Sequence, residues 1–185
     1  MSTATSIGPR RAGLRAYTAA RAVAAAVLAV VVTFSADHTP GFGLLVFGAF
    51  SVVQGAIIGF AVPSSAVTTA GRLLGAARAA VLIVLGATAL SLPGGGLGSL
   101  LLIETVAFLV AGVLEVLSGL RRADANPASR DAITVGGLQL VVGAMLSIVN
   151  PDAIFAVGVL GMWAAIVAVY LGIAAVSLSR RDRSA

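Results

Sequence analysis

Long apolar runs separated by very short gaps dominate this chain of 185 residues. All six prolines lie outside these runs, and Pro40, Pro93 and Pro151 each occupy a short gap between two of them. The runs are roughly 20 residues long, the length that a helix needs to cross the hydrocarbon core of a bilayer. Because 59% of the residues are hydrophobic and only 10% are charged, the chain has too little polar surface for a soluble domain. We therefore expect an all-α polytopic membrane protein with six transmembrane helices.

The gaps divide the chain into three helical hairpins. Each hairpin enters and leaves the membrane on the same side, so we expect parallel rather than inverted repeats. A flexible basic arm is expected at residues 1–16 and a basic tail at residues 180–185. The expected membrane domain is residues 17–179, its hairpins are 17–62, 73–120 and 133–179, and its spans are 17–36, 41–62, 73–92, 97–120, 133–150 and 153–179. The length of the first span and a poor cleavage site at residues 34–36 favour a retained span over a signal peptide.

The basic residues gather at alternate ends of the apolar runs, and all 12 of them are arginine. The opposite ends carry only Asp37, His38 and Asp152. This asymmetry follows the positive-inside rule and predicts that both termini are cytoplasmic. The net charge of +5 is then a topology signal and not a sign of nucleic-acid binding.

The three outward-facing groups are candidates for a response to external pH, because histidine titrates near neutral pH and aspartate in acid. The alternative is that they are ordinary turn residues. Few other residues can support chemistry. The chain has no cysteine and one histidine, and it has no Ser-His-Asp set and no metal-ligand cluster. The glycine run at residues 94–96 lacks the lysine of a nucleotide-binding loop. The sequence therefore predicts no enzyme, no cofactor and no metal site.

Two acidic residues lie inside the span at residues 97–120. Glu104 and Glu115 are eleven residues apart, about three helical turns, so they share one face of the helix. Arg78, in the preceding span, lies at the depth of Glu115, and we predict an ion pair between them. Other polar residues at a similar depth are expected to complete a polar layer: Arg21, Gln54 and Gln139.

Charged groups inside a bilayer are costly, so they usually have a partner or a task. The predicted layer could fix the register of the helices, or it could form a path for protons or a substrate. A third reading is that Arg21 and Arg78 extend to the headgroups. Glu104 has no basic residue at its depth, so burial favours the neutral acid. It could then bond a neighbouring carbonyl, or it could respond to pH.

Glycines recur at intervals of seven residues. GAFSVVQG (48–55) resembles GVLEVLSG (112–119), and Gly86 and Gly143 lie seven and eight residues before Pro93 and Pro151. Small residues on one face let helices approach closely in lipid, either within the chain or between copies of it and other membrane proteins. The candidate packing residues are Gly48, Gly55, Gly59, Gly112, Gly119, Gly136 and Gly143.

Two motifs carry a resemblance to a known family: GVLEVLSGLRR (112–122) and GGLQLVVGAMLSIVNP (136–151), followed by the glycines between residues 158 and 172. Over residues 17–180 the chain resembles the HdeD-like acid-resistance membrane proteins, small six-span proteins of two-helix repeats. The first hairpin departs most from that pattern, because its turn is longer and more polar.

The resemblance implies a protein of the bacterial inner membrane that is associated with acid stress and has no catalytic residues. It favours a non-enzymatic role in envelope or acid-stress tolerance. One alternative is a small proton-coupled transporter or channel that uses the Glu104/Glu115 face. Another is a scaffold that packs other membrane proteins through its glycine faces. A hydrated path beside the two glutamates would favour transport, whereas a dry core with an exposed face of small residues would favour the scaffold.

Overall fold

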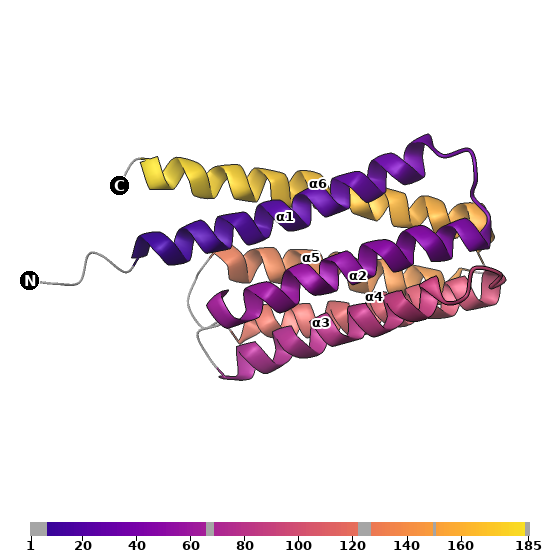
Figure 1. Cartoon of the computed structure of the whole chain (residues 1–185), viewed down its shortest axis with the longest axis horizontal. Helices are drawn as coiled ribbons and strands as arrows, with labels where there is room; N and C mark the ends of the chain where they lie inside the picture. The colour runs from indigo at the N-terminus through magenta and orange to yellow at the C-terminus, as the bar shows by residue number, and fades with distance from the viewer. Residues whose placement is uncertain (1–6, 66–68, 122–126, 150, 184–185) are drawn as a thin grey trace, which may run out of the picture.

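A computed structural model describes residues 7–65, 69–121, 127–149 and 151–183. These ranges contain six α-helices and no β-strand (Figure 1). Each helix includes a stretch that is long and apolar enough to cross a bilayer. The chain is therefore a multi-pass helical membrane protein, as predicted. The helices are α1 (Ile7–Phe34), α2 (Pro40–Ser65), α3 (Thr69–Leu90), α4 (Leu97–Leu120), α5 (Pro127–Ile148) and α6 (Ala153–Arg183).

The helix boundaries differ from the expected spans mainly at one end of the bundle. The predicted flexible arm is helical from Ile7 onward, and the first six residues lie outside the described part. Helix α5 begins at Pro127, well before the expected start at residue 133. Proline is tolerated in the first turn of a helix, where its missing N–H needs no partner. The proline that suggested a loop is therefore the start of α5.

Side-chain caps fix the starts of two helices. The amide of Phe42 donates to Thr39 Oγ1 at 3.3 Å, which caps α2, and Pro40 follows as its first residue. The amide of Phe155 donates to Asp152 Oδ1 at 2.7 Å, which caps α6. Caps of this kind satisfy backbone N–H groups that have no partner within the helix. Both of these helix starts lie at the same end of the bundle (Figure 1).

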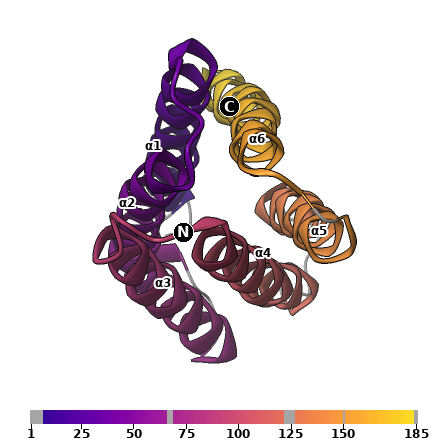
Figure 2. The same ribbon diagram turned by 90° about the vertical axis from the view of Figure 1, so that its right-hand side faces the viewer.

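The six helices follow one another around a closed bundle, and α6 returns to pack along α1 (Figure 2). We call the end where α1 begins and α6 ends the terminal end. The opposite end, with the short connections after α1, α3 and α5, is the turn end (Figure 1). Helices α2, α4 and α6 are more central: half of the apolar window of α2 and of α6 is buried, against 28% in α3. The second helix of each hairpin therefore forms the core.

The most extensive contacts join helices of different hairpins. Helix α2 packs most closely on α3, α4 on α5, and α6 on α1. Within the hairpins, the contacts of α1 with α2 and of α3 with α4 are smaller, and those of α5 with α6 are smaller still. The two helices of each predicted hairpin are thus consecutive in the chain, but each of them packs more extensively on a helix of another hairpin.

Glycines explain which helices pack most closely. A Cβ on Gly48 would lie 2.9 Å from the carbonyl oxygen of Gly86, and a Cβ on Gly112 would lie 3.0 Å from that of Gly136. The α2–α3 and α4–α5 contacts are therefore backbone against backbone, which only glycine allows. Gly136, and not Gly143, thus corresponds to Gly86, so the sequence match by distance to proline was two turns out of register.

The predicted packing glycines are confirmed with one exception. A Cβ at six of them would approach another atom to 3.0 Å or less, and these are Gly48, Gly55, Gly112, Gly119, Gly136 and Gly143. Gly59 is exposed, and a Cβ there would meet only the Cβ of Ala79, at an ordinary 3.7 Å. Gly59 therefore makes no such close approach within the chain, and packing between copies, the other alternative, stays a prediction for it.

Candidate functional site

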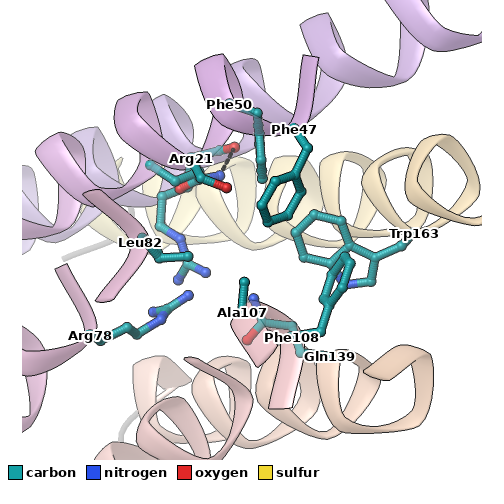
Figure 3. Close-up of a pocket in the computed structure, with 11 residues that line it drawn as sticks. Arg21, Phe47, Phe50, Arg78, Leu82, Ala107, Phe108, Gln139 and Trp163 are labelled. Carbon is teal, nitrogen blue, oxygen red and sulfur yellow. Dashed lines mark hydrogen bonds between the residues drawn. The ribbon is translucent and has the colours of Figure 1, made fainter. Parts of the chain in front are cut away.

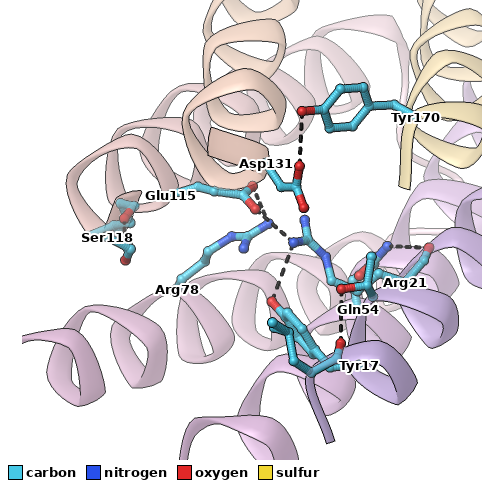
Figure 4. A network of polar contacts seen from close by, with 11 residues as sticks. Tyr17, Arg21, Gln54, Arg78, Glu115, Ser118, Asp131 and Tyr170 are labelled. Carbon is cyan, nitrogen blue, oxygen red and sulfur yellow. Dashed lines mark hydrogen bonds and ion pairs between the residues drawn. The ribbon is translucent and has the colours of Figure 1, made fainter. Parts of the chain in front are cut away.

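Glu115 of α4 lies between two arginines from different helices (Figure 4). Its Oε1 is 2.8 Å from Nη1 of Arg21 on α1, and its Oε2 is 2.5 Å from Nη2 of Arg78 on α3. The three side chains are 2–7% exposed. The predicted Arg78–Glu115 pair is confirmed, and Arg21 completes a triad. The reading in which the two arginines extend to the headgroups was wrong, because both guanidinium groups are held inside the bundle.

Further polar contacts extend from this triad. Arg21 donates from Nη1 to the hydroxyl of Tyr17 at 3.3 Å, and its guanidinium lies 5.5 Å from the centre of that ring. Gln54 Nε2 donates to the carbonyl oxygen of Arg21 at 3.3 Å. On the other side, the Tyr170 hydroxyl donates to Asp131 Oδ1 at 3.0 Å. Asp131 is partly buried, and its charge interacts with that of Arg21.

Sequence reasoning missed Tyr17, Asp131 and Tyr170. Asp131 was placed in a loop because α5 was expected to start after it, and Tyr17 and Tyr170 lay within predicted spans without an assigned role. One signal was available: proline is common at the first position of a helix, and a helix that begins at Pro127 contains Asp131.

All six helices contribute to this polar layer. Its members are Tyr17 and Arg21 of α1, Gln54 of α2, Arg78 of α3, Glu115 of α4, Asp131 and Gln139 of α5, and Tyr170 of α6. Five members were predicted at similar depths, Glu115 among them, and the structure places the other four around one small cavity: Arg21, Gln54, Arg78 and Gln139. Polar groups are rare in the interior of membrane proteins unless they bind or relay something, or hold helices together.

The cavity adjoins the polar layer on the side of the turn end (Figure 3). It has a volume of about 20 Å³. Its apolar wall is an aromatic group in which Phe108 lies 6.3 Å from Phe47 and 5.0 Å from Trp163, between ring centres. Trp163 also meets Phe50 edge-on, with ring centres 5.6 Å apart. The cavity thus has an aromatic wall on one side and two cationic side chains on the other.

Glu104 lies deeper than this cavity, toward the turn end. It is 0% exposed, and neither of its carboxyl oxygens has a hydrogen-bond partner among the described residues. The predicted bond to a neighbouring carbonyl is therefore absent from that part of the chain. On the same face of α4, Leu100 one turn before and Phe108 one turn after are both buried. An uncompensated carboxylate in such surroundings is very costly, so the neutral acid is favoured.

The three outward-facing candidates lie apart from this core, at the turn end. Asp152 is the cap of α6 described above. Asp37 Oδ1 accepts from the amide of Thr39 at 2.8 Å. Hydrogen bonding from Thr39 holds the pKa of Asp37 below its ordinary value of 3.8. Asp37 and Asp152 are exposed and His38 is partly buried, and none of the three is part of the polar layer.

The chemistry open to the site is binding and proton exchange by carboxyl, guanidinium, amide and hydroxyl groups. In the described ranges, no three His, Cys, Asp or Glu side chains come together to hold a metal ion. Comparisons with protein-family models, with curated proteins and with solved structures found no match to this chain.

Proposed function

We propose that this protein is a small, non-enzymatic transporter that couples the movement of a solute to that of a proton. The observation that carries the proposal is Glu104, a fully buried carboxyl group without a partner in the described part of the chain. Acidic residues inside membrane spans often mark proton pathways in pumps and transporters. A carboxyl group kept only for packing would be replaced at no cost by an apolar side chain of similar size.

The surroundings of Glu104 suit a proton that exchanges only when the helices move. On the turn side, the core is closed by Leu44, Leu100 and Val157, all 0% exposed. On the terminal side, the aromatic group separates Glu104 from Glu115, which lies about 16 Å further along α4 at a rise of 1.5 Å per residue. The hydrated path expected beside the two glutamates is not seen in the described residues, since neither of them lines the cavity. The proposal is therefore of a carrier that opens to one side at a time and is closed in this state.

Among the residues that the structure describes, the other charged or titratable groups that face this core belong to the polar layer. They are Tyr17 and Arg21 on α1, Arg78 on α3, Glu115 on α4, Asp131 on α5 and Tyr170 on α6, and α2 contributes the neutral Gln54. Glu115 is fixed by two cations, which makes it a poor proton carrier. Glu104, which pairs with neither arginine, is therefore the group that takes up and releases the proton.

The proposal predicts that Glu104→Gln strongly slows proton movement. Purified protein in lipid vesicles, with the membrane potential clamped and an internal pH-sensitive dye, should dissipate an imposed pH gradient. We expect the pH gradient to decay about tenfold more slowly, or slower still, with the variant. A positioned proton-transfer group in an enzyme accelerates the reaction by ~10²–10⁴-fold. Asp152→Asn, an acid-to-amide change at the turn end, should keep the wild-type rate. A Glu104→Gln variant as fast as wild type would refute the proposal.

The resemblance described above suggests that this activity serves acid-stress tolerance. In a strain that lacks the protein, Glu104→Gln should then fail to restore survival in acid. The triple variant Asp37→Asn, His38→Gln, Asp152→Asn should still restore it. The scaffold alternative has less support, because the six close-packing glycines are used inside the bundle and not on an outer face.

We also propose that the terminal end faces the cytoplasm of a bacterial cell. Four exposed arginines support this orientation, and they all lie toward the terminal end: Arg15, Arg72, Arg121 and Arg130. The exposed charged residues at the turn end are Asp37 and Asp152 among the residues described there. Reporter fusions at residues 38, 95 and 152 should report the outside, and fusions at residue 67, at residue 126 and at the C-terminus should report the cytoplasm. A C-terminus found outside would reverse the assignment.

A further inference from the structure

The cavity beside the polar layer has cationic but no acidic walls. Its lining includes Arg21 and Arg78, and neither Glu104 nor Glu115 is part of it. The two arginines share a single carboxylate in the triad, so one positive charge of that triad is not balanced within it. Asp131 interacts with Arg21 and balances that charge, but it does not line the cavity. The wall of the cavity itself therefore carries two cations and no acid, which favours an anion there.

Several hydrogen-bond donors around the cavity have no partner in the described residues. They include Trp163 Nε1, Ser51 Oγ and the Nε atoms of Arg21 and Arg78. The indole N–H can only donate, and a hydroxyl can turn its hydrogen toward an anion. Trp163 is 3% exposed and Ser51 is 1% exposed, so no lipid or bulk solvent satisfies these groups. Gln139 also lines the cavity, and its amide could present its NH₂ by turning over.

The volume limits what can bind. About 20 Å³ is enough for roughly one water-sized sphere. A sulfate, phosphate or carboxylate ion is several atoms larger and would require the aromatic group to move. We propose that this cavity binds a single monatomic anion of about the size of chloride, held by Arg21, Arg78, Ser51, Gln139 and Trp163. A water molecule is the competing occupant, because Gln54 Oε1 adds an unpaired acceptor to the wall.

This inference rests on the proposed transport function in one respect: if the protein is a carrier, the anion in the cavity identifies its solute as a halide. Binding itself does not depend on Glu104, which is absent from the cavity lining. A failure of proton transport would therefore leave anion binding measurable, and a failure of anion binding would leave proton transport measurable with another solute.

Trp163 is the single tryptophan of the chain, so its fluorescence reports directly on the cavity. Purified protein should be titrated with sodium chloride, with sodium gluconate used to keep the ionic strength constant. We expect a saturable change in Trp163 emission with chloride and with bromide, and none with gluconate or sulfate. Chloride should also raise the unfolding temperature, because a ligand that binds only the folded state stabilises it.

Two variants test the assignment without breaking the ion pairs. Ser51→Ala and Gln139→Leu should each weaken chloride binding by about tenfold, the usual order for a lost hydrogen bond to a charged group. Ser118→Ala is the matched control: Ser118 is also buried, but its hydroxyl already donates to the Leu114 carbonyl at 2.7 Å and it does not line the cavity. It should bind chloride like wild type.

Three results would overturn the proposal. A response that does not saturate, or that gluconate reproduces, would mean that the cavity holds water only. A saturable response that survives both Ser51→Ala and Gln139→Leu would place the anion elsewhere. Binding of sulfate as tight as that of chloride would contradict the size limit. Circular dichroism and size-exclusion chromatography show whether Ser51→Ala or Gln139→Leu is misfolded. If one of them is, the chloride affinity of the other tests the proposal.

Discussion

Glu115→Gln should destabilise the bundle more than any other single change in the polar layer. The variant would leave Arg21 and Arg78 buried together without the carboxylate that separates them. Removing one partner of a buried ion pair costs about 3–5 kcal/mol in soluble proteins, and here one residue serves two pairs. Unfolding of the purified protein in mixed detergent micelles, followed by circular dichroism, measures the loss. Arg78→Gln should cost less, because it leaves the Arg21–Glu115 pair intact.

Glu104→Gln provides the matched control for that measurement. It is the same substitution on the same helix, at a position that is equally buried but has no ion pair in the described residues. We expect almost no change in its free energy of unfolding, since a neutral acid and an amide differ little in size and polarity. The double variant Arg78→Gln, Glu115→Gln should lose less than the sum of its single variants. Simple additivity would contradict the coupling that the geometry implies.

Gly136→Ala should separate α4 from α5. The new Cβ would lie 2.9 Å from three atoms, and two of these belong to the backbone of α4, the Gly112 oxygen and the Val116 nitrogen. Backbone atoms cannot turn aside as a flexible side chain can, so the two helices must move apart along their contact. We expect a loss of about 3 kcal/mol, the upper end of the cost of overpacking. The same unfolding measurement in detergent tests this value.

A substitution at the neighbouring Gly137 distinguishes a steric clash of the new Cβ from a general effect of replacing glycine in the helix. Gly137 is in the same helix, and a Cβ there would have no atom within 4 Å. Gly137→Ala should therefore be neutral or stabilising by up to about 1 kcal/mol, from the higher helix propensity of alanine. Equal losses in the two variants would mean that the close approach of Gly112 and Gly136 does not hold the helices together.

The sequence could predict those features that depend on distance along one helix or on depth in the membrane. Helix α4 has the expected bounds, and the pairing of Glu115 with Arg78 follows from their equal depth on successive helices. Lateral order around the bundle was not predictable in this way. The participation of Arg21 in the triad depends on α1 lying beside the core, and depth alone does not determine which helices are neighbours.

The glycines illustrate the same limit. Their spacing identified a packing face on α2 and on α4, and the contacts confirm it. Matching by distance to proline, however, paired Gly86 with Gly143, because it assumed that the glycines in closest contact lie equally far from the turn end in every hairpin, whereas the α4–α5 contact lies further from it than the α2–α3 contact. The structure instead sets Gly136 opposite Gly112, where two backbones can meet. A residue such as Asp131 was missed for a different reason: a proline can begin a helix as readily as it can interrupt one.

The return of α6 to α1 has a consequence for how the protein is made. The chain enters the membrane from its N-terminal end, so Arg21 and Arg78 arrive before Glu115, and α1 arrives long before the helix against which it packs most closely. Neither arginine can be neutralised by this acid until the fourth helix has been inserted. The long flank of α1 that finally meets α6 stays without its partner until the sixth helix has been inserted. Until the fourth helix arrives, α1 therefore lacks both the acid that pairs with Arg21 and the helix against which it packs most closely.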